Sequence, residues 1–220
     1  MIQPFRSLDP EFIIKEGSTL LGISVSNEIV SKMMKHMRLL VDWSSRINLT
    51  ALTDPRDIAV LHFLDSLAVF KVVPRSCSLS ILDVGSGAGF PGIVMRTLEE
   101  SIDLTVLDRN PKKIVFLKYL AKELNFSGVR FLNFHLKELL DEHFTGLFDL
   151  AISRAFSSDP HLLNALHVLL PLGGSLVRMA GPGSMKRAFR LQNFEESSRW
   201  EGSLPFSNSF RSVLRYTKIR

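Results

Sequence analysis

The chain has 220 residues, enough for one sizeable domain or for a domain with an extension. Its 27 basic and 22 acidic residues leave a formal net charge of +5, which fits a polyanionic partner such as RNA but does not identify one. The single cysteine excludes an internal disulfide, and no apolar stretch has the length of a membrane span or of a secretory signal. We therefore expect a cytoplasmic protein without a membrane partner.

The first third of the chain is predicted to be helical. Amphipathic spacing indicates helices over residues 11–21 and 27–47. We expect residues 1–75 to form an N-terminal helical extension and residues 76–220 to form the ligand-binding domain.

The helix over residues 27–47 has two kinds of face. Met33 and Met37 are predicted to pack in the core rather than to bind a cofactor. The basic residues on the other faces contact either solvent or RNA. They are Lys32, Lys35, His36 and Arg38.

A further helix is predicted to start at Pro55, with Asp54 as its N-cap. Along it, His62, Asp65 and Ser66 share one face because they are three and four residues apart. This polar face is either a ligand contact or a hydrogen-bond network within the helix. It has too few ligands for a metal, and we expect no metal site.

The most informative segment runs from an apolar strand over residues 80–84 into a glycine-rich loop and then into a helix predicted to start at Pro91. Gly85, Gly87 and Gly89 allow a tight turn and the close approach of a ligand to the backbone. Such a unit is typical of the first strand of a doubly wound sheet, where it forms a ligand cradle.

Asp83 indicates which ligand the loop binds. It lies two residues before Gly85, so its carboxylate would repel a dinucleotide pyrophosphate. A ligand with an ammonium and a sulfonium group, such as S-adenosylmethionine, would be favoured. The alternative is that Asp83 is only a structural cap.

A second acid follows the next strand. Residues 104–107 are predicted to be extended, and Asp108 comes about 20 residues after the glycines, where an acid can accept hydrogen bonds from ribose hydroxyls. The alternative role, an N-cap of the following helix, is better filled by Asn110, which immediately precedes Pro111.

The remainder alternates between strands and helices. Ser153 and Arg154 follow the strand over residues 148–152, where open α/β sheets bind ligands. The other elements are strands over 129–134 and 174–180, helices over 111–124, 159–170 and up to about 192, a helical turn over 136–140, and a closing hairpin of two strands over 204–220. This order predicts a Rossmann-like α/β fold.

Four motifs together carry a resemblance that covers essentially the whole chain. They are Asn48-Leu49-Thr50-Ala51, His62-Phe63-Leu64-Asp65-Ser66-Leu67, the loop from Asp83 to Phe90-Pro91-Gly92, and Ser153-Arg154-Ala155. On these motifs the chain resembles the GidB/RsmG family, bacterial methyltransferases of 16S ribosomal RNA. The resemblance implies a class I S-adenosylmethionine-dependent methyltransferase with a seven-stranded, mostly parallel sheet. It also implies methyl transfer to the N7 atom of a guanine in the decoding-region loop of the small ribosomal subunit.

This chemistry needs no general base, because guanine N7 has a free lone pair and loses no proton before it attacks. Positioning should supply most of the rate. A cation beside N7 would oppose the positive charge that moves to the purine. We therefore expect Arg154 to position the substrate through a phosphate or guanine O6.

The residues and the resemblance together give the expected contacts. Cofactor contacts are Asp83, Gly85, Ser86, Gly87, Gly89, Phe90, Asp108, Arg109, Lys137, Glu138 and Arg154. RNA contacts, made by a monomer to 16S ribosomal RNA or the small subunit, are His62, Asp65, Ser66, Arg178 and Arg211. Arg178 is included because the Lys-Gly pair of the family aligns with Ala180-Gly181, and Arg178 lies on the same strand face as Ala180.

The chain also departs from the family pattern before the helix motif, where it has Leu61, and after the third strand, where it has His135-Leu136-Lys137. Two other functions therefore stay open. One is a noncatalytic RNA-binding paralogue that kept the fold. The other is an NAD-binding oxidoreductase, which Asp83 disfavours.

Overall fold

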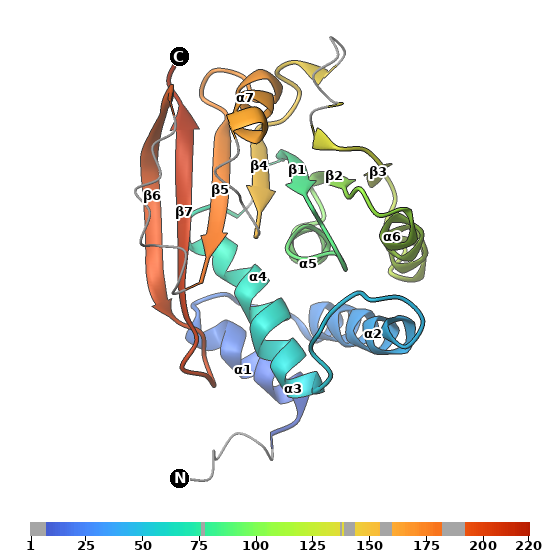
Figure 1. Ribbon diagram of the computed structural model, residues 1–220. Coiled ribbons are helices and arrows are strands. Elements are labelled where there is room, and N and C mark those ends of the chain that lie inside the picture. Colours follow the sequence, from blue (N-terminus) through green and yellow to red (C-terminus); the bar gives the residue numbers. More distant parts are fainter. Residues whose placement is uncertain (1–7, 76–77, 137, 139–143, 155–159, 182–191) are drawn as a thin grey trace.

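The structure is a computed structural model that describes residues 8–75, 78–136, 138, 144–154, 160–181 and 192–220. Within these residues one sheet of seven strands has the order β3-β2-β1-β4-β5-β7-β6 (Figure 1). The strands are β1 (Ser80–Val84), β2 (Asp103–Leu107), β3 (Arg130–Leu132), β4 (Leu150–Ser153), β5 (Ser175–Ala180), β6 (Phe194–Ser203) and β7 (Phe210–Lys218). The first five are parallel, and β7 pairs antiparallel with both β5 and β6. The predicted fold class is confirmed.

The strand order reverses beside β1. The chain moves outward from β1 to β2 and β3, and then returns to β4 on the other side of β1. In open α/β sheets the ligand binds at the carboxyl ends of the strands at this point. Asp83 lies in the middle of the sheet there, opposite Val106 of β2 and Ile152 of β4.

Helices cover both faces of the sheet (Figure 1). They are α1 (Pro10–Leu20), α2 (Asn27–Ser44), α3 (Pro55–Ile58), the π-helical segment η2 (Ala59–Leu64), α4 (Asp65–Leu67), the 3₁₀ segment η3 (Ala68–Lys71), α5 (Gly92–Leu98), α6 (Pro111–Glu123) and α7 (Pro160–Leu169). Two predicted caps are confirmed: Asp54 Oδ1 accepts from the Arg56 N–H at 2.9 Å, and Asn110 Oδ1 accepts from the Lys112 N–H at 3.0 Å. None of the helices in the described ranges is long and apolar enough to cross a bilayer.

The N-terminal helices share a core with the sheet. One cluster of buried side chains includes Ile13 of α1, Met33 and Met37 of α2, Val177 of β5 and Val213 of β7. The core role of the two methionines is therefore confirmed. The division into an extension over 1–75 and a domain over 76–220 stays a prediction.

The opposite face of the sheet packs on α7. Leu176 of β5, Leu214 of β7 and Leu166 of α7 belong to a second buried cluster. Neighbouring strand residues point to opposite faces. This alternation decides which side chains reach the functional site.

The closing hairpin was predicted too late in the chain. Its strands are β6 and β7, which begin at Phe194 and Phe210, so only one strand lies within 204–220. The β6 sequence lacks a hydrophobic pattern because β6 is an edge strand with many exposed side chains. The helix expected up to about residue 192 lies outside the described residues.

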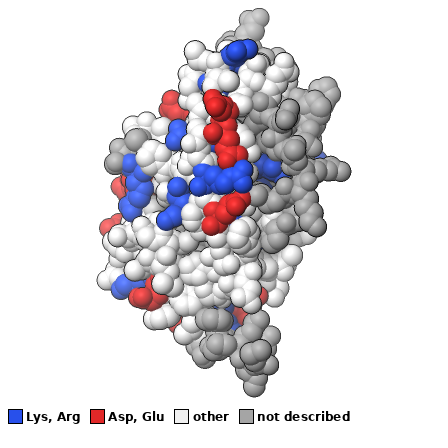
Figure 2. All heavy atoms as spheres, turned by 90° about the vertical axis from the view of Figure 1, so that its left-hand side faces the viewer, with Lys and Arg blue, Asp and Glu red and all other residues white. Residues whose placement is uncertain are grey.

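Figure 2 looks onto this edge and shows acidic and basic side chains next to one another. Arg199 of β6 pairs with Glu196 at 2.8 Å and with Glu201 at 2.9 Å. Charges on an edge strand oppose pairing with a strand of another chain.

Candidate cofactor and substrate site

The glycine-rich loop connects β1 to α5 across the carboxyl ends of the central strands. Gly85, Gly87 and Gly89 have φ values of 74°, 58° and 92°, a region that favours glycine. The Gly85 N–H donates to the carbonyl of Leu107 at 2.8 Å, which ties the loop to β2. A Cβ atom on Gly85 would meet nothing within 4 Å, so a ligand can approach the backbone there. The helix after the loop begins at Gly92, one residue later than predicted, with Pro91 as its N-cap.

Asp83 is fully buried beneath this loop. Its Oδ2 atom accepts from the Gly92 N–H at 2.9 Å, and a Cβ atom on Gly92 would lie 2.5 Å from that oxygen. Its Oδ1 atom is buried and has no hydrogen-bond partner among the described residues. Burial raises the pKa of Asp83 from 3.8 to about 6. Asp83 therefore caps the helix after the loop and keeps an Oδ1 acceptor that no described residue satisfies.

Asp108 organises the neighbouring hollow. Its Oδ2 atom accepts from the Gly87 N–H at 3.0 Å, and its Oδ1 atom accepts from the Asn110 N–H at 2.8 Å. The hollow has a volume of about 300 Å³, and three expected cofactor residues, Gly85, Asp108 and Arg109, line it. A carboxylate has further lone pairs for ribose hydroxyls, so this hollow suits the adenosine part of the cofactor.

The same hollow contains side chains that the sequence analysis missed. They are Val84, Leu107, Lys113, Phe134 and His135; Leu136, which also lines the hollow, starts the turn that was expected over 136–140 to flank the adenine. The residues after β3 could have been predicted as part of the site, because the carboxyl ends of all parallel strands meet at the same edge of the sheet. Glu138 accepts from the His135 N–H at 3.0 Å and so shapes this turn, whereas Lys137 lies outside the described residues.

A buried ion cluster lies beside the loop. Asp65 of α4 forms ion pairs with two arginines. Its Oδ1 atom lies 3.1 Å from Arg211 Nε, and its Oδ2 atom lies 3.8 Å from Arg154 Nη1. Burial raises the pKa of Asp65, while the two guanidinium groups lower it. The structure thus brings together Asp65, Arg154 and Arg211, three residues predicted from distant segments to contact the substrate.

His62 holds Arg154 from the other side. The His62 Nδ1 atom lies 3.1 Å from Arg154 Nη1, and its Nε2 atom lies 2.8 Å from Thr50 Oγ1. The Leu61 carbonyl also lies 3.1 Å from Nδ1, so both ring nitrogens of His62 are engaged by neighbouring polar groups. Burial, followed by the charge of Arg154, lowers the pKa of His62 to about 4. His62 is therefore neutral at neutral pH and positions Arg154.

Two expected RNA contacts are placed differently. Ser66 is fully buried and donates to the His62 carbonyl at 2.6 Å, so it belongs to a network within the helix. On β5, Val177 and Met179 point to the sheet face that packs on the N-terminal helices. Because neighbouring strand residues alternate between faces, Arg178 points to the other face, which packs on α7. It is also 8% exposed, and the structure does not bring it to the ion cluster.

Phe90 joins the loop to the N-terminal helices. His36 and His62 stack on its ring with centroid distances of 4.7 and 4.6 Å, and the Arg154 guanidinium lies 5.2 Å from its centroid. His36 also bonds the Ala88 carbonyl at 2.8 Å through Nε2. The N-terminal helices therefore hold the glycine-rich loop in place, by stacking on Phe90 and by the hydrogen bond to the Ala88 carbonyl.

The expected placement of His36 on a solvent or RNA face is wrong. His36 is 1% exposed because it lies three residues after Met33 and four before Leu40, on the buried face of α2. Lys32 and Lys35 are engaged in ion pairs with Glu100 at 3.0 Å and Glu123 at 2.8 Å.

The buried His36 predicts an acid-sensitive fold. Burial lowers its pKa from 6.5 to about 3, so the unfolded chain binds an extra proton between these values. The stability that this group contributes is present above pH 6.5 and is lost as the pH falls. In urea unfolding between pH 5.5 and 4, the unfolding free energy of the wild type should decline more steeply than that of His36→Phe, by about 1.4 kcal/mol per pH unit. His62 and Asp83 are present in both proteins and cancel in this comparison; parallel pH curves would contradict the prediction.

No group of three or more His, Cys, Asp or Glu side chains suited to a metal occurs in the part of the chain that the structure describes. The site consists of a glycine-rich loop over a buried acid, an acid-lined hollow at the next strand, and a positioned arginine at the end of β4. Together with the sheet order, these features define a class I S-adenosylmethionine-dependent methyltransferase.

Comparison with known proteins identifies the family. The family model GidB, described as rRNA small subunit methyltransferase G, matches residues 29–200. The ribosomal RNA small subunit methyltransferase G of Caldanaerobacter subterraneus is 31% identical over 214 residues, covering 94% of this chain and 89% of the relative. The chain therefore belongs to the GidB family.

Solved structures agree on the fold. A predicted O-methyltransferase from Agrobacterium tumefaciens aligns with a TM-score of 0.57 at 16% identity, over 70% of this chain and 80% of that one. A TehB-like SAM-dependent methyltransferase from Corynebacterium glutamicum aligns with a TM-score of 0.51 at 21% identity, over 70% and 86% of the two chains.

Proposed function

We propose that this protein methylates the N7 atom of a guanine in the decoding-region loop of 16S ribosomal RNA, with S-adenosylmethionine as methyl donor. Family membership and the names of the relatives support ribosomal RNA of the small subunit as the substrate. The single structural observation that carries the methyl-donor part is the Oδ1 atom of Asp83, which is buried beneath the glycine-rich loop and has no hydrogen-bond partner among the described residues.

The cofactor supplies an electrophilic methyl group on a sulfonium when it is bound. Asp83 is suited to pair with its ammonium group, and Asp108 to accept hydrogen bonds from its ribose hydroxyls. Gly85 and Gly87 present open backbone between these two acids. The loop thereby orients the donor from one end to the other.

Arg154 is suited to hold the RNA at the carboxyl end of β4. Its guanidinium is fixed by His62, Asp65 and the ring of Phe90, and 26% of its side chain remains exposed. An arginine fixed in this way can position a phosphate or guanine O6 without lying against N7. His62 is not a base for the reaction, because Thr50 engages its Nε2 atom, and Arg154 and the Leu61 carbonyl engage its Nδ1 atom.

We further propose that the protein acts as a monomer in the cytoplasm, where ribosomal RNA is the polyanion that matches its net charge of +5. The test of the function is methylation of small-subunit RNA, naked and as assembled subunits, from a strain that lacks this gene. Labelled S-adenosylmethionine should yield one 7-methylguanosine in that loop. RNA binding without methyl transfer would instead support the noncatalytic alternative.

A further inference from the structure

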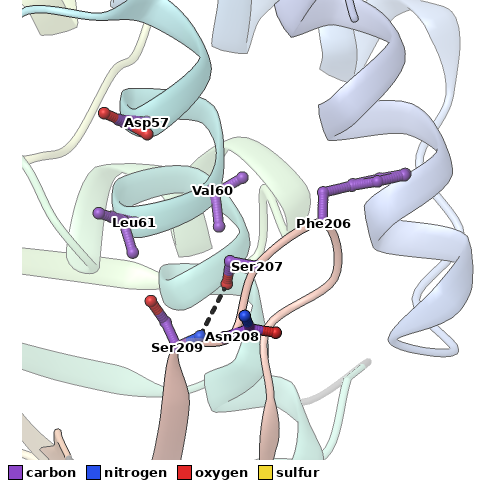
Figure 3. A pocket seen from close by; sticks show the side chains of 7 residues that line it. All are labelled: Asp57, Val60, Leu61, Phe206, Ser207, Asn208 and Ser209. Atoms are coloured by element: carbon purple, nitrogen blue, oxygen red, sulfur yellow. Dashed lines mark hydrogen bonds between the residues drawn. The ribbon is translucent and has the colours of Figure 1, made fainter. Parts of the chain in front are cut away.

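A pocket of about 480 Å³ lies between the helix that runs through α3 and η2 and the turn that joins β6 to β7 (Figure 3). Its walls are Asp57, Val60 and Leu61 on the helix side and Phe206, Ser207, Asn208 and Ser209 on the turn side. A volume of this size falls in the range of small-molecule sites, so it can take a nucleobase.

The turn side of the pocket is held by its own hydrogen bonds. Ser207 Oγ accepts from the Ser209 N–H at 3.1 Å, and the Leu204 N–H donates to the Ser209 carbonyl at 2.9 Å. Phe206 packs near Phe12 of α1, with ring centroids 6.2 Å apart. The pocket wall is therefore pre-formed, which reduces the entropy cost of binding.

Both walls continue into the ion cluster around Arg154. On the helix side, the Leu61 carbonyl lies 3.4 Å from Arg154 Nη1, and His62 follows directly. On the turn side, Ser209 is two residues before Arg211, which bonds Asp65. The pocket therefore adjoins the residues that are suited to hold the RNA, because Leu61 lines the pocket and its carbonyl contacts Arg154.

The chemistry of the pocket favours one base. Asp57 points its carboxylate along the helix side above Leu61 (Figure 3) and would repel a phosphate. Val60 and Leu61 supply apolar surface for a flat ring. A carboxylate accepts two parallel hydrogen bonds, and guanine presents two adjacent donors, N1–H and the 2-amino group. These donors lie on the side of the purine away from N7, so N7 stays free.

We propose that this pocket binds a guanine of the RNA substrate and that Asp57 reads its N1–H and 2-amino edge. This inference rests on the proposed function and adds a specificity residue to it. The guanine is either the methylated base or its neighbour in the strand, since the chemistry is the same for both.

The test compares Asp57→Asn with the wild type on small-subunit RNA carrying inosine, which lacks the 2-amino group, at the target guanine or at a neighbouring guanine. For the wild type, inosine at one position should lower kcat/KM about 10-fold. Asp57→Asn should be about 10-fold slower on unmodified RNA and indifferent to inosine at that position. Asp42→Asn, which alters an exposed carboxylate of α2 paired with Arg46, should match the wild type on every RNA.

Each outcome decides the inference. An inosine effect at the target assigns the pocket to the methylated base, and an effect at a neighbour assigns it to the adjoining base; both support the proposal. An Asp57→Asn enzyme that matches the wild type, or that still distinguishes inosine, overturns it while wild-type methylation persists. No methylation of unmodified RNA by the wild type would overturn the proposed function, and this inference with it.

Discussion

Replacement of Arg154 by alanine should lower kcat/KM for RNA methylation at least about 100-fold, because the substrate would no longer be held in line with the methyl group. Binding of S-adenosylmethionine should stay within a few-fold of the wild type, because Asp83 and Asp108 are untouched. Single-turnover methyl transfer and calorimetric titration of the cofactor measure the two effects separately. The fold should persist, since Asp65 keeps its 3.1 Å contact with Arg211.

Two further variants test whether the loss of activity is specific to the guanidinium of Arg154. Arg154→Lys should recover only part of the activity, because an ammonium keeps the charge but not the planar fork of donors. Arg130→Ala removes an arginine from β3 that pairs with Asp103 at 3.0 Å, and it should methylate RNA normally. Full activity of Arg154→Ala on RNA would show that Arg154 does not position the substrate.

Replacement of Asp83 by asparagine should have opposite effects on binding and stability. The affinity for S-adenosylmethionine should fall about 100-fold, because the variant loses a buried, charge-assisted contact to the ammonium group. The unfolding free energy at pH 8 should rise by about 1–3 kcal/mol, because a buried carboxylate with its pKa raised from 3.8 to about 6 is costly when ionised. Asparagine can still accept from the Gly92 N–H.

The sign of the pH effect follows from the same shift. Between pH 3.8 and about 6 the folded wild type binds more protons than the unfolded chain, so this group makes stability decline as the pH rises. Asp83→Asn should lack that decline in urea unfolding curves. Asp103→Asn, at the exposed start of β2, is the matched control and should bind the cofactor as the wild type does. An unchanged cofactor affinity in Asp83→Asn would contradict the assignment of the ammonium site.

Local chemistry explains which features were predictable. The glycines before α5 and the caps Asp54 and Asn110 act on backbone within a few residues of themselves, and the acids Asp83 and Asp108 lie at the carboxyl ends of β1 and β2. Such short-range requirements leave a direct pattern in the sequence. They were sufficient to predict the fold class, the cradle and the methyl donor, and the family resemblance added the RNA substrate.

Long-range packing decided the rest. Arg211 bonds Asp65 across 146 residues, and His36 and His62 enclose Phe90 from two separate helices. The face to which Arg178 points depends on the register between β5 and its neighbours. The sequence by itself therefore determined the strand–loop–helix cradle and the position of its acids at the strand ends, because adjacent residues specify where a strand ends and a glycine turn begins. Only the tertiary structure decided how Arg154 is held and where the pocket between the α3–η2 helix and the β6–β7 turn lies. Those contacts join segments that meet only after the sheet has formed.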